Sequence, residues 1–356
     1  MQRRAFLGVC AALLPGFAGA PTASAAASPR SAGAAEAPAA QSTAPSGGGW
    51  PDRPIRIVVP FGAGGVADLV ARTVGKALAE RLGQPVVVDN RPGAGGIVAG
   101  RIVANAAPDG STLLLLSNGT AVSEGLFARL PYDARRDFVP VSTLGRFDLA
   151  VIVPATSPFA SLSELLEFAR RRPGRLNVAT VSVGSTQHLA AELLRMTAGV
   201  EFQVVPFTGT PAVLGALRGG HVDVAVEILA PMLPQIEAGV LKALAVMGAA
   251  RSQALKDVPT VAESAHANGS AAGSELAGFD VSSWNALAAP AGTPPAIVER
   301  LNRELRQVLE SSAVRDGLAR LNVQAMASSP EELARLLDSE IRRWQDVIAR
   351  AGIPLQ

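Results

Sequence analysis

Residues 55–88, IRIVVPFGAGGVADLVARTVGKALAERLGQPVVV, decide the fold class. They open with the β-branched run Ile55–Val59, which is typical of a buried strand and stops at Pro60, a residue that cannot donate to a ladder. After a glycine-rich loop, apolar residues recur at helical spacing over residues 66–82, and residues 85–88 form a second apolar run. Strand, loop, helix and strand in this order predict a right-handed parallel unit.

The same alternation continues along the chain, so we predict an α/β fold. Ser161 followed by Glu164 indicates a capping box at the start of one helix. We expect strands at residues 113–116, 149–153, 176–179, 204–207, 222–226 and 242–246, and helices at 97–105, 162–171, 186–197 and from Pro211. Residues 265–278 are a small-residue insertion that we expect to be a loop, and amphipathic outer-layer helices are expected at 295–309, 313–321 and 330–351.

The amino-terminal residues predict export. Arg3 and Arg4 precede an apolar run over residues 5–20, which is too short to cross a bilayer but long enough for a signal peptide. The two arginines followed by Phe6 and Leu7 favour the twin-arginine route, and an ordinary Sec signal is the alternative. We expect residues 1–25 to be removed. Residues 26–49 are nearly all Ala, Ser, Pro, Gly and Thr, and predict a disordered tether.

The composition argues against several functions. Cys10 is the only cysteine and lies in the predicted signal, so the mature chain is expected to have no internal disulfide; a lipoprotein anchor at Cys10 is a weaker alternative. The formal charge of +2 falls to about zero without Arg3 and Arg4, and no basic run with aromatic platforms is present, so nucleic-acid binding has no support. Because no later apolar run reaches spanning length, we expect a soluble periplasmic monomer.

Polar and glycine-rich loops follow several of the predicted strands and open helices. Open α/β sheets bind ligands at the carboxyl ends of their strands, and helix N-termini bind anions through free N–H groups. A charge-assisted hydrogen bond contributes about 1.5 to 3 kcal/mol and association costs about 4 to 15 kcal/mol, so several loops must converge. The loops of this kind are residues 61–65, 92–96, 117–120, 182–185 and 208–210.

The glycines and serines of these loops also allow chemistry other than anion binding. The spacing Gly62-x-Gly64-x-x-Ala67, with Asp89 ending the next strand, allows a nicotinamide-dinucleotide site and hence an exported NAD-dependent oxidoreductase, although Pro60 and Phe61 separate the strand from the glycines. A third explanation is that these glycines serve only to form tight turns. Ser182 or Ser185 near His188 could form a nucleophile and base, but Ser185 and His188 are better explained as a helix cap and a polar ligand contact. No metal-ligand spacing is present.

The chain resembles the extracytoplasmic receptors of tripartite tricarboxylate transporters, the Bug family. The resemblance is carried by Ile57-Val58-Val59-Pro60-Phe61-x-Ala63-Gly64-Gly65-x-x-Asp68, by Leu82-Gly83-Gln84-Pro85-Val86-Val87-Val88-x-Asn90-Arg91-Pro92-Gly93-Ala94-Gly95-Gly96 and by Pro108-Asp109-Gly110. It extends through Gly184-Ser185-x-x-His188-Leu189 to Ala289-Pro290-Ala291-Gly292-Thr293-Pro294, and so covers nearly all of the chain after Trp50.

This resemblance implies a two-lobed type II periplasmic-binding-protein fold with the ligand cleft between the lobes. The first lobe would comprise residues 50–150 and 248–356, and the second lobe residues 151–247. It also implies a receptor without enzymatic activity or cofactor. Such a receptor closes backbone amides around a small carboxylate (a di- or tricarboxylate, an acidic amino acid or an aromatic carboxylate) and delivers it to a two-component permease. The implied ligand-binding residues are Phe61, Ala63, Gly64, Gly65, Asp68, Ser117, Thr120, Ser182, Gly184, Ser185, His188, Thr208, Gly209 and Glu227.

The two acidic residues in this list each have more than one interpretation. Asp68 lies in the first turn of a helix, where a carboxylate either contacts the ligand or simply complements the helix dipole. Glu227 would repel a carboxylate but could receive an amine or a protonated ligand, so we expect it to govern specificity. The family usually has Asp at that position and a shorter loop at residues 265–278. The sequence leaves open which carboxylate binds, and whether the role is uptake or signalling.

Overall fold

The computed structural model describes residues 49–266 and 273–356. The chain divides into Met1–Ala44 and Pro45–Gln356, and the fold described below belongs to the second part. The predicted signal peptide, with Cys10, and the predicted tether apart from Gly49 lie outside the described residues. None of the described helices is long and apolar enough to cross a membrane.

Strands and helices alternate, as the sequence predicts. The strands are β1 (Ile55–Val59), β2 (Val86–Asn90), β3 (Thr112–Ser117), β4 (Phe138–Pro154), β5 (Asn177–Val181), β6 (Gln203–Phe207), β7 (Val224–Ile228), β8 (Leu241–Val246), β9 (Ser282–Pro290) and β10 (Gln324–Ala325). The helices are α1 (Val66–Leu82), η1 (Ala94–Gly96), α2 (Ile97–Ala104), α3 (Asn118–Leu126), α4 (Leu162–Arg171), α5 (Thr186–Thr197), α6 (Thr210–Arg218), η2 (Ala230–Met232), α7 (Leu233–Glu237), α8 (Val261–His266), α9 (Gly273–Leu276), α10 (Pro295–Glu310), α11 (Ser312–Ala319) and α12 (Pro330–Arg350).

The strands of the described residues join in one mixed sheet, in the order β2-β1-β3-β9-β4-β7-β5-β6, with β8 and β10 also paired to β4. The pairs β1–β2, β1–β3, β5–β6 and β5–β7 are parallel, so the predicted parallel units are confirmed. Strand β9 runs antiparallel to both β3 and β4. The fold is therefore mixed α/β.

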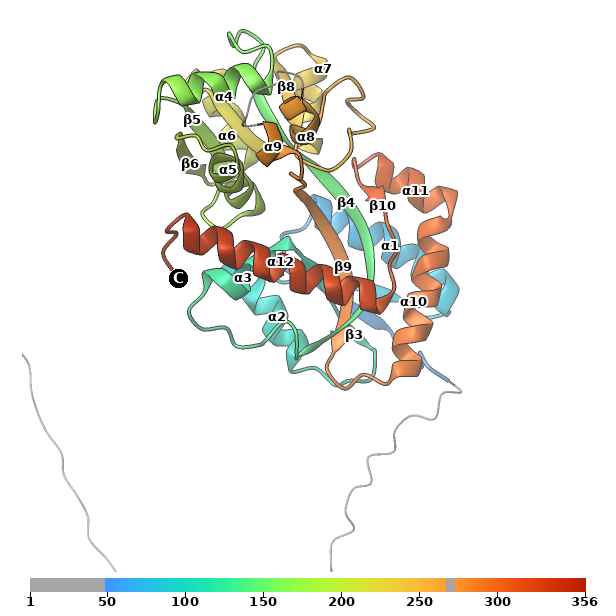
Figure 1. The fold of residues 1–356 in the computed structure, drawn as a ribbon. Coiled ribbons are helices and arrows are strands. Elements are labelled where there is room, and N and C mark those ends of the chain that lie inside the picture. The colour runs from blue at the N-terminus through green and yellow to red at the C-terminus, as the bar shows by residue number, and fades with distance from the viewer. Residues whose placement is uncertain (1–48, 267–272) are drawn as a thin grey trace, which may run out of the picture. The chain divides into compact units, whose positions relative to one another are not determined.

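The long strand β4 belongs to two parts of the sheet. Its residues 138–148 pair with β9, and its residues 149–154 pair with β7 and β8. We call β2, β1, β3, β9, β10 and residues 138–148 of β4 the first half-sheet. The second half-sheet comprises residues 149–154 of β4 with β8, β7, β5 and β6. In Figure 1, β4 and β9 run side by side where the two half-sheets meet.

Three apolar clusters stabilise the two half-sheets. Helices α1, α10 and α11 cover one face of the first half-sheet, and α2, α3 and α12 cover its other face. The second half-sheet lies between α4 and α5 on one face and α6 and α7 on the other. The predicted outer-layer helices after residue 295 are thus confirmed, and each buries an apolar stripe against the sheet.

Three elements differ from the sequence prediction. Strand β4 begins at Phe138 rather than at residue 149, β9 was not predicted, and residues 118–126 form α3 instead of ending in a loop. The insertion is also not wholly loop, because α8 extends to His266 and α9 forms a single turn. The placement of residues 267–272 is outside the described part of the chain.

The predicted capping box at α4 forms only in part. The Ser161 side chain accepts from the backbone N–H of Glu164 at 3.2 Å. The Glu164 carboxylate instead accepts from the N–H of Ala160 at 2.7 Å, one residue before the cap. A reciprocal box does form at α12, between Ser329 and Glu332.

Candidate functional site

Four helices begin at the carboxyl ends of parallel strands. Helices α1 and α3 follow β1 and β3 of the first half-sheet, and α5 and α6 follow β5 and β6 of the second. Their N-cap residues are Gly65, Ser117, Ser185 and Gly209, all of them predicted ligand-binding residues. Each helix leaves N–H groups of its first turn without a helical partner, which is the arrangement that binds anions.

Asp68 organises the first of these loops. Its carboxylate accepts from the N–H of Gly64 at 2.8 Å, from the side chain of Arg72 at 2.9 Å and from the Asn90 amide at 2.9 Å. The amide of Asn90 also donates to the carbonyl of Phe61. Burial alone would raise the pKa of Asp68, but these donors outweigh it and hold that pKa below its usual range. Asp68 therefore fixes the loop before α1. This agrees with the interpretation that its carboxylate stabilises the start of the helix.

The Gly64 contact also bears on the dinucleotide alternative. A dinucleotide fingerprint uses glycine N–H groups in this loop to approach a pyrophosphate. Here the N–H of Gly64 is donated to Asp68, and Asp89 at the end of β2 pairs with Arg91 at 2.9 Å. Both groups that the nucleotide interpretation needs are thus engaged within the protein.

The start of α3 is fixed by a buried amide that the sequence did not single out. The Oδ1 of Asn118 accepts from the backbone N–H of Trp284 at 3.0 Å, and its Nδ2 donates to the carbonyl of Ser282 at 3.2 Å and to Glu340 at 3.3 Å. Ser117 caps the helix, and its own N–H lies 3.5 Å from the Thr120 hydroxyl. These contacts fix the first turn of α3 against β9.

The second half-sheet holds its own group of predicted residues. The N–H of Ser182 donates to the carbonyl of Phe207 at 2.9 Å, which joins the loop before α5 to the segment leading to Thr208 and Gly209. The Ser185 hydroxyl donates to the carbonyl of Val181 at 2.7 Å and accepts from the N–H of His188 at 3.1 Å. Because the Ser185 proton is directed at a carbonyl and not at an imidazole, these residues form a helix cap and not a nucleophile with its base.

His188 is held neutral by its surroundings. Burial lowers the pKa of His188, and the nearby Glu192 opposes that effect. The Nδ1 of His188 lies 3.5 Å from the N–H of Gly184 and acts as the acceptor in that long contact.

Glu227 is the acidic group of the second half-sheet. It is fully buried near the carboxyl end of β7. Its Oε1 accepts from the Gln187 side chain at 2.6 Å and from the N–H of Ile228 at 2.8 Å. Its Oε2 has no hydrogen-bond partner within the described part of the chain. Burial raises the pKa of Glu227, against hydrogen bonds from Gln187 and Ile228 that lower it. The nearby Thr210 side chain lowers that pKa too, without a hydrogen bond to Oε2.

Further unpartnered polar atoms lie on β9, which sequence reasoning did not mark. The Oδ1 of Asn285 and the Nε1 of Trp284 are buried without a partner among the described residues. Asn285 stands opposite Ser117 in the β3–β9 register and opposite Gly145 in the β4–β9 register. It therefore lies in the middle of the first half-sheet, level with the N-cap of α3. No motif marked it, because β9 itself was not predicted.

The loop before α5 approaches the first half-sheet at the end of α3. A Cβ atom on Gly184 would overlap the side chain of Leu126 at the end of α3, and α3 and α12 both contact α5. In the first half-sheet, the Ser123 hydroxyl lies 2.8 Å from the carbonyl oxygen of Gly119 and 3.2 Å from that of Gly95, which places the second glycine-rich loop beside α3. The loops at residues 92–96 and 182–185 thus both lie beside α3.

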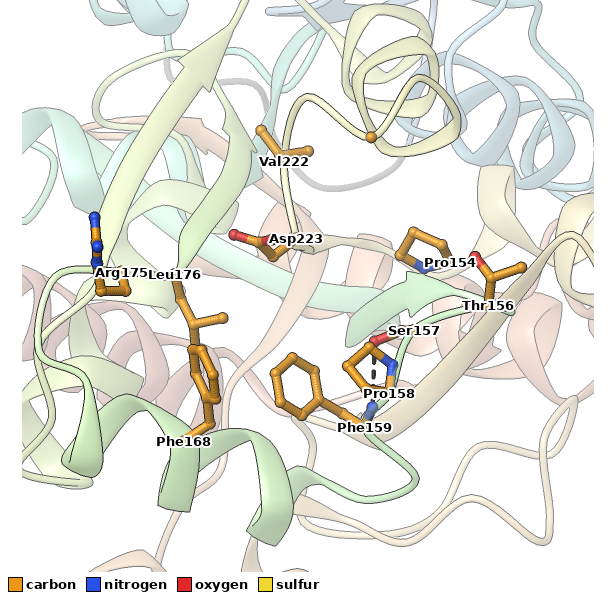
Figure 2. Close-up of a pocket in the computed structure, with 11 residues that line it drawn as sticks. Pro154, Thr156, Ser157, Pro158, Phe159, Phe168, Arg175, Leu176, Val222 and Asp223 are labelled. Atoms are coloured by element: carbon orange, nitrogen blue, oxygen red, sulfur yellow. Dashed lines mark hydrogen bonds between the residues drawn. The ribbon is translucent and has the colours of Figure 1, made fainter.

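Two cavities lie away from the predicted ligand-binding residues. The one drawn in Figure 2 has a volume of about 340 Å³ and lies beside Pro154, Phe159, Phe168 and Asp223, at the ends of β5 and β7 away from Glu227. The rings of Phe159 and Phe168 meet edge to face with centroids 5.3 Å apart. A second cavity of about 500 Å³ lies beside Glu124 and Tyr132. No predicted ligand-binding residue lines either cavity.

A comparison with known proteins assigns the family. Residues 70–353 match the model of the tripartite tricarboxylate transporter family receptor. The chain belongs to this receptor family. The resemblance to Bug receptors is confirmed, since the chain is 35% identical to the protein BugT of Bordetella pertussis over 309 residues, which cover 86% of this chain and 92% of BugT. No group of three or more His, Cys, Asp or Glu residues able to hold a metal ion occurs in the described part of this receptor.

Solved structures of similar receptors support the same fold. The chain is 34% identical to Rpa4515 of R. palustris, solved with adipate, with a TM-score of 0.73. It is 36% identical to MatC of Rhodopseudomonas palustris, solved with bound malate, with a TM-score of 0.68. These matches cover 86% and 84% of this chain and the whole of each neighbour. The chain is also 29% identical to the periplasmic binding protein BugD, with a TM-score of 0.70. This receptor therefore has the two-lobed periplasmic-binding-protein fold that the family resemblance implied.

Proposed function

We propose that this chain is an exported receptor that captures a small carboxylate between its two half-sheets and delivers it to a two-component membrane permease in the periplasm. The observation that carries the proposal is a contact between the two half-sheets, where Gly184 in the loop before α5 packs against Leu126 at the end of α3. The helices that follow β1, β3, β5 and β6 all begin at the carboxyl ends of their strands. Micromolar affinity needs about 8 kcal/mol after the cost of association, so loops from both sides must contribute.

Main-chain amides would hold the first carboxylate of the ligand. Gly65 and Ser117 cap helices whose free N–H groups favour a negative charge. His188 would add a neutral hydrogen-bonding group. Proposed ligand contacts are those implied by the family resemblance, Phe61, Ala63, Gly64, Gly65, Ser117, Thr120, Ser182, Gly184, Ser185, His188, Thr208, Gly209 and Glu227, with Asp68 acting through the loop that it fixes.

The ligand class proposed is an aliphatic dicarboxylate. Similar receptors have been solved with adipate and with malate. Phe61 and Val183 are 40% and 41% exposed and belong to the loops before α1 and α5, where they offer apolar surface to the carbon chain of a ligand. We also assign Asn285 to the site, because a buried amide oxygen without a partner is costly unless a ligand or water satisfies it.

The lobes proposed are residues 50–150 with 248–356, and residues 151–247. The change of partner within β4 at residue 149 supports the first boundary. The chain returns between β8 and β9, where the N–H of Val281 donates to the carbonyl of Met247 at 2.7 Å, and this supports the second boundary. A monomer would close its two lobes by bending where the chain crosses between them.

A thermal-shift panel tests the proposal. The mature chain is heated alone and with malate, adipate, citrate, glutamate, nicotinate and NAD, each at a concentration series up to millimolar. A ligand present at about a hundred times its dissociation constant adds about 2.7 kcal/mol of stability, so a bound carboxylate raises the melting temperature. A shift with NAD and with none of the carboxylates would overturn the proposal.

A further inference from the structure

The buried carboxyl of Glu227 has one satisfied and one unsatisfied oxygen. Oε1 accepts two hydrogen bonds, from the Gln187 side chain at 2.6 Å and from the N–H of Ile228 at 2.8 Å. Oε2 has none within residues 49–266 and 273–356, although the side chain is fully buried. A buried polar atom without a partner is destabilising, so Oε2 is expected to meet a group that the free chain does not supply.

The hydrogen bonds also fix where a proton on Glu227 must lie. Two N–H donors already point at Oε1, so that oxygen can only accept. A proton on this carboxyl therefore resides on Oε2. The protonated side chain presents a single O–H donor near the carboxyl end of β7, beside Gln187 in the first turn of α5.

Among the described residues, no charged group compensates an ionised Glu227. Burial raises the pKa of Glu227, and the polar groups of Gln187, Ile228 and Thr210 lower it. An anionic Glu227 facing a ligand carboxylate would bring two uncompensated charges together, whereas a shared proton replaces repulsion by a hydrogen bond. The titratable groups on the elements packed against β7 are Arg146 and Asp148 on β4, His188, Glu192 and Arg195 on α5, and Arg218 on α6.

We propose that Glu227 binds the ligand in its protonated form and donates the Oε2 proton to the second carboxylate of a dicarboxylate, so that binding takes up one proton from solvent. The inference rests on the proposed function and adds a requirement to it. The step balances simply, because one proton moves from water to Oε2 and no other covalent bond changes. A neutral Glu227 thereby selects a second carboxylate over an ammonium group, the reverse of what an ionised Glu227 would select.

Calorimetry counts the proton directly. Adipate and malate are titrated into the mature chain at pH 6, 7 and 8, in pairs of buffers that differ in ionisation enthalpy. Above the pKa of free Glu227, the wild type should take up close to one proton per ligand, and Kd should rise by about tenfold per pH unit.

The variant Glu227→Gln provides a permanent donor. Because Oε1 is held by Gln187 and Ile228, the new amide nitrogen occupies the position of Oε2. This variant should bind the dicarboxylate within about threefold of the low-pH wild type, with no proton uptake and a flat pH profile. Glu167→Gln, an exposed carboxylate on α4, is the matched control and should keep the wild-type proton uptake.

The outcomes separate the two proposals. Wild-type binding without proton uptake would overturn the inference and leave the receptor function standing. Uptake that persists in Glu227→Gln would overturn it as well, and would assign the proton to His188. If the wild type bound no carboxylate at any pH, the receptor function would fail and this inference with it. The wild-type proton count needs no variant, so a folding defect in Glu227→Gln does not affect it.

Discussion

Gly184 packs so closely against Leu126 that a Cβ atom at position 184 would overlap the leucine side chain. Gly184 also adopts a positive φ of 77°, which other residues rarely take. Leu126 ends α3 beside the first half-sheet, and Gly184 lies in the loop before α5 of the second. The contact therefore couples the loop before α5, to which we assign the ligand, to the end of α3 in the first half-sheet.

Gly184→Ala should weaken both the fold and ligand binding. The left-handed conformation costs about 1–2 kcal/mol for a residue with a Cβ, and the overlap with Leu126 adds about 1–3 kcal/mol. Urea unfolding measures the loss of stability, and calorimetry with adipate measures the affinity. The double variant Gly184→Ala, Leu126→Ala should recover part of the affinity because it removes the overlap. Unchanged stability and affinity in the single variant would show that the contact does not form in solution.

Asp68→Asn should destabilise the chain by about 1–3 kcal/mol at neutral pH, because the carboxylate accepts from Gly64, Arg72 and Asn90. The pKa of Asp68 is lowered on folding, so its stabilising contribution is present above the unfolded pKa near 3.8 and is lost as the pH falls through the folded value. Urea unfolding of both chains at pH 7 and pH 3 tests this, and the difference should shrink in acid.

The control for Asp68 is Asp346→Asn. Asp346 forms an exposed pair with Arg350 at 3.3 Å on α12. Exposed pairs contribute about 0–1 kcal/mol, so this variant should unfold like the wild type. An equal loss of unfolding free energy in both variants would show that Asp68 contributes no more than an exposed charge.

Asn285→Leu should separate affinity from stability. The Asn285 amide oxygen is buried without a partner, and an apolar residue of similar size there is expected to be neutral or stabilising for the free chain. If Asn285 contacts the ligand, the same variant should lose at least about tenfold in affinity for adipate. A variant that binds as well as the wild type would remove Asn285 from the site.

The elements that could be predicted from sequence are those whose local pattern agrees with the fold. Helix α1 combines an apolar stripe with Gly83 at φ 68° after its last turn, and α4 has the bounds predicted for it. The N-cap of α5 at Ser185 was also predicted. In each case the signal lies within about twenty residues of sequence.

The elements that were missed depend on distant contacts. Strand β9 is rich in alanine and serine and is held between β3 and β4. The start of β4 contains Pro140 and Gly145, which weaken a strand pattern; both lie where its pairing with β9 shifts register. Helix α3 opens with Asn118-Gly119, poor helix formers, and is fixed through Asn118 by contacts with Trp284 and Glu340 more than 160 residues away.

The candidate site was predicted through the same local signals. The starts of α1, α3, α5 and α6 could be found because glycine and serine follow apolar strands. The sequence could not show that the Glu227 carboxyl has one free oxygen, since Gln187 lies 40 residues earlier in the chain. It also could not mark Asn285, whose register opposite Ser117 exists only in the folded sheet.

Glu227 should also make the stability of the free chain depend on pH. Burial raises the pKa of Glu227 on folding, so its contribution is fully present below the unfolded pKa near 4.5 and is lost as the pH rises through the folded value. Relative to Glu227→Gln, the wild type should lose stability with rising pH, by at most about 1.4 kcal/mol per pH unit. Urea unfolding of both chains from pH 5 to pH 8 measures it, and parallel pH profiles would contradict a raised pKa.

A crystal structure of the mature chain with adipate tests the central claim most directly. We predict one ligand carboxylate within about 2.7–3.2 Å of main-chain N–H groups at the starts of α1 or α3, with the other end of the ligand beside α5 and Glu227. Ligand density in the cavity lined by Phe159 and Phe168, or a carboxylate held only by arginine or lysine side chains, would contradict it.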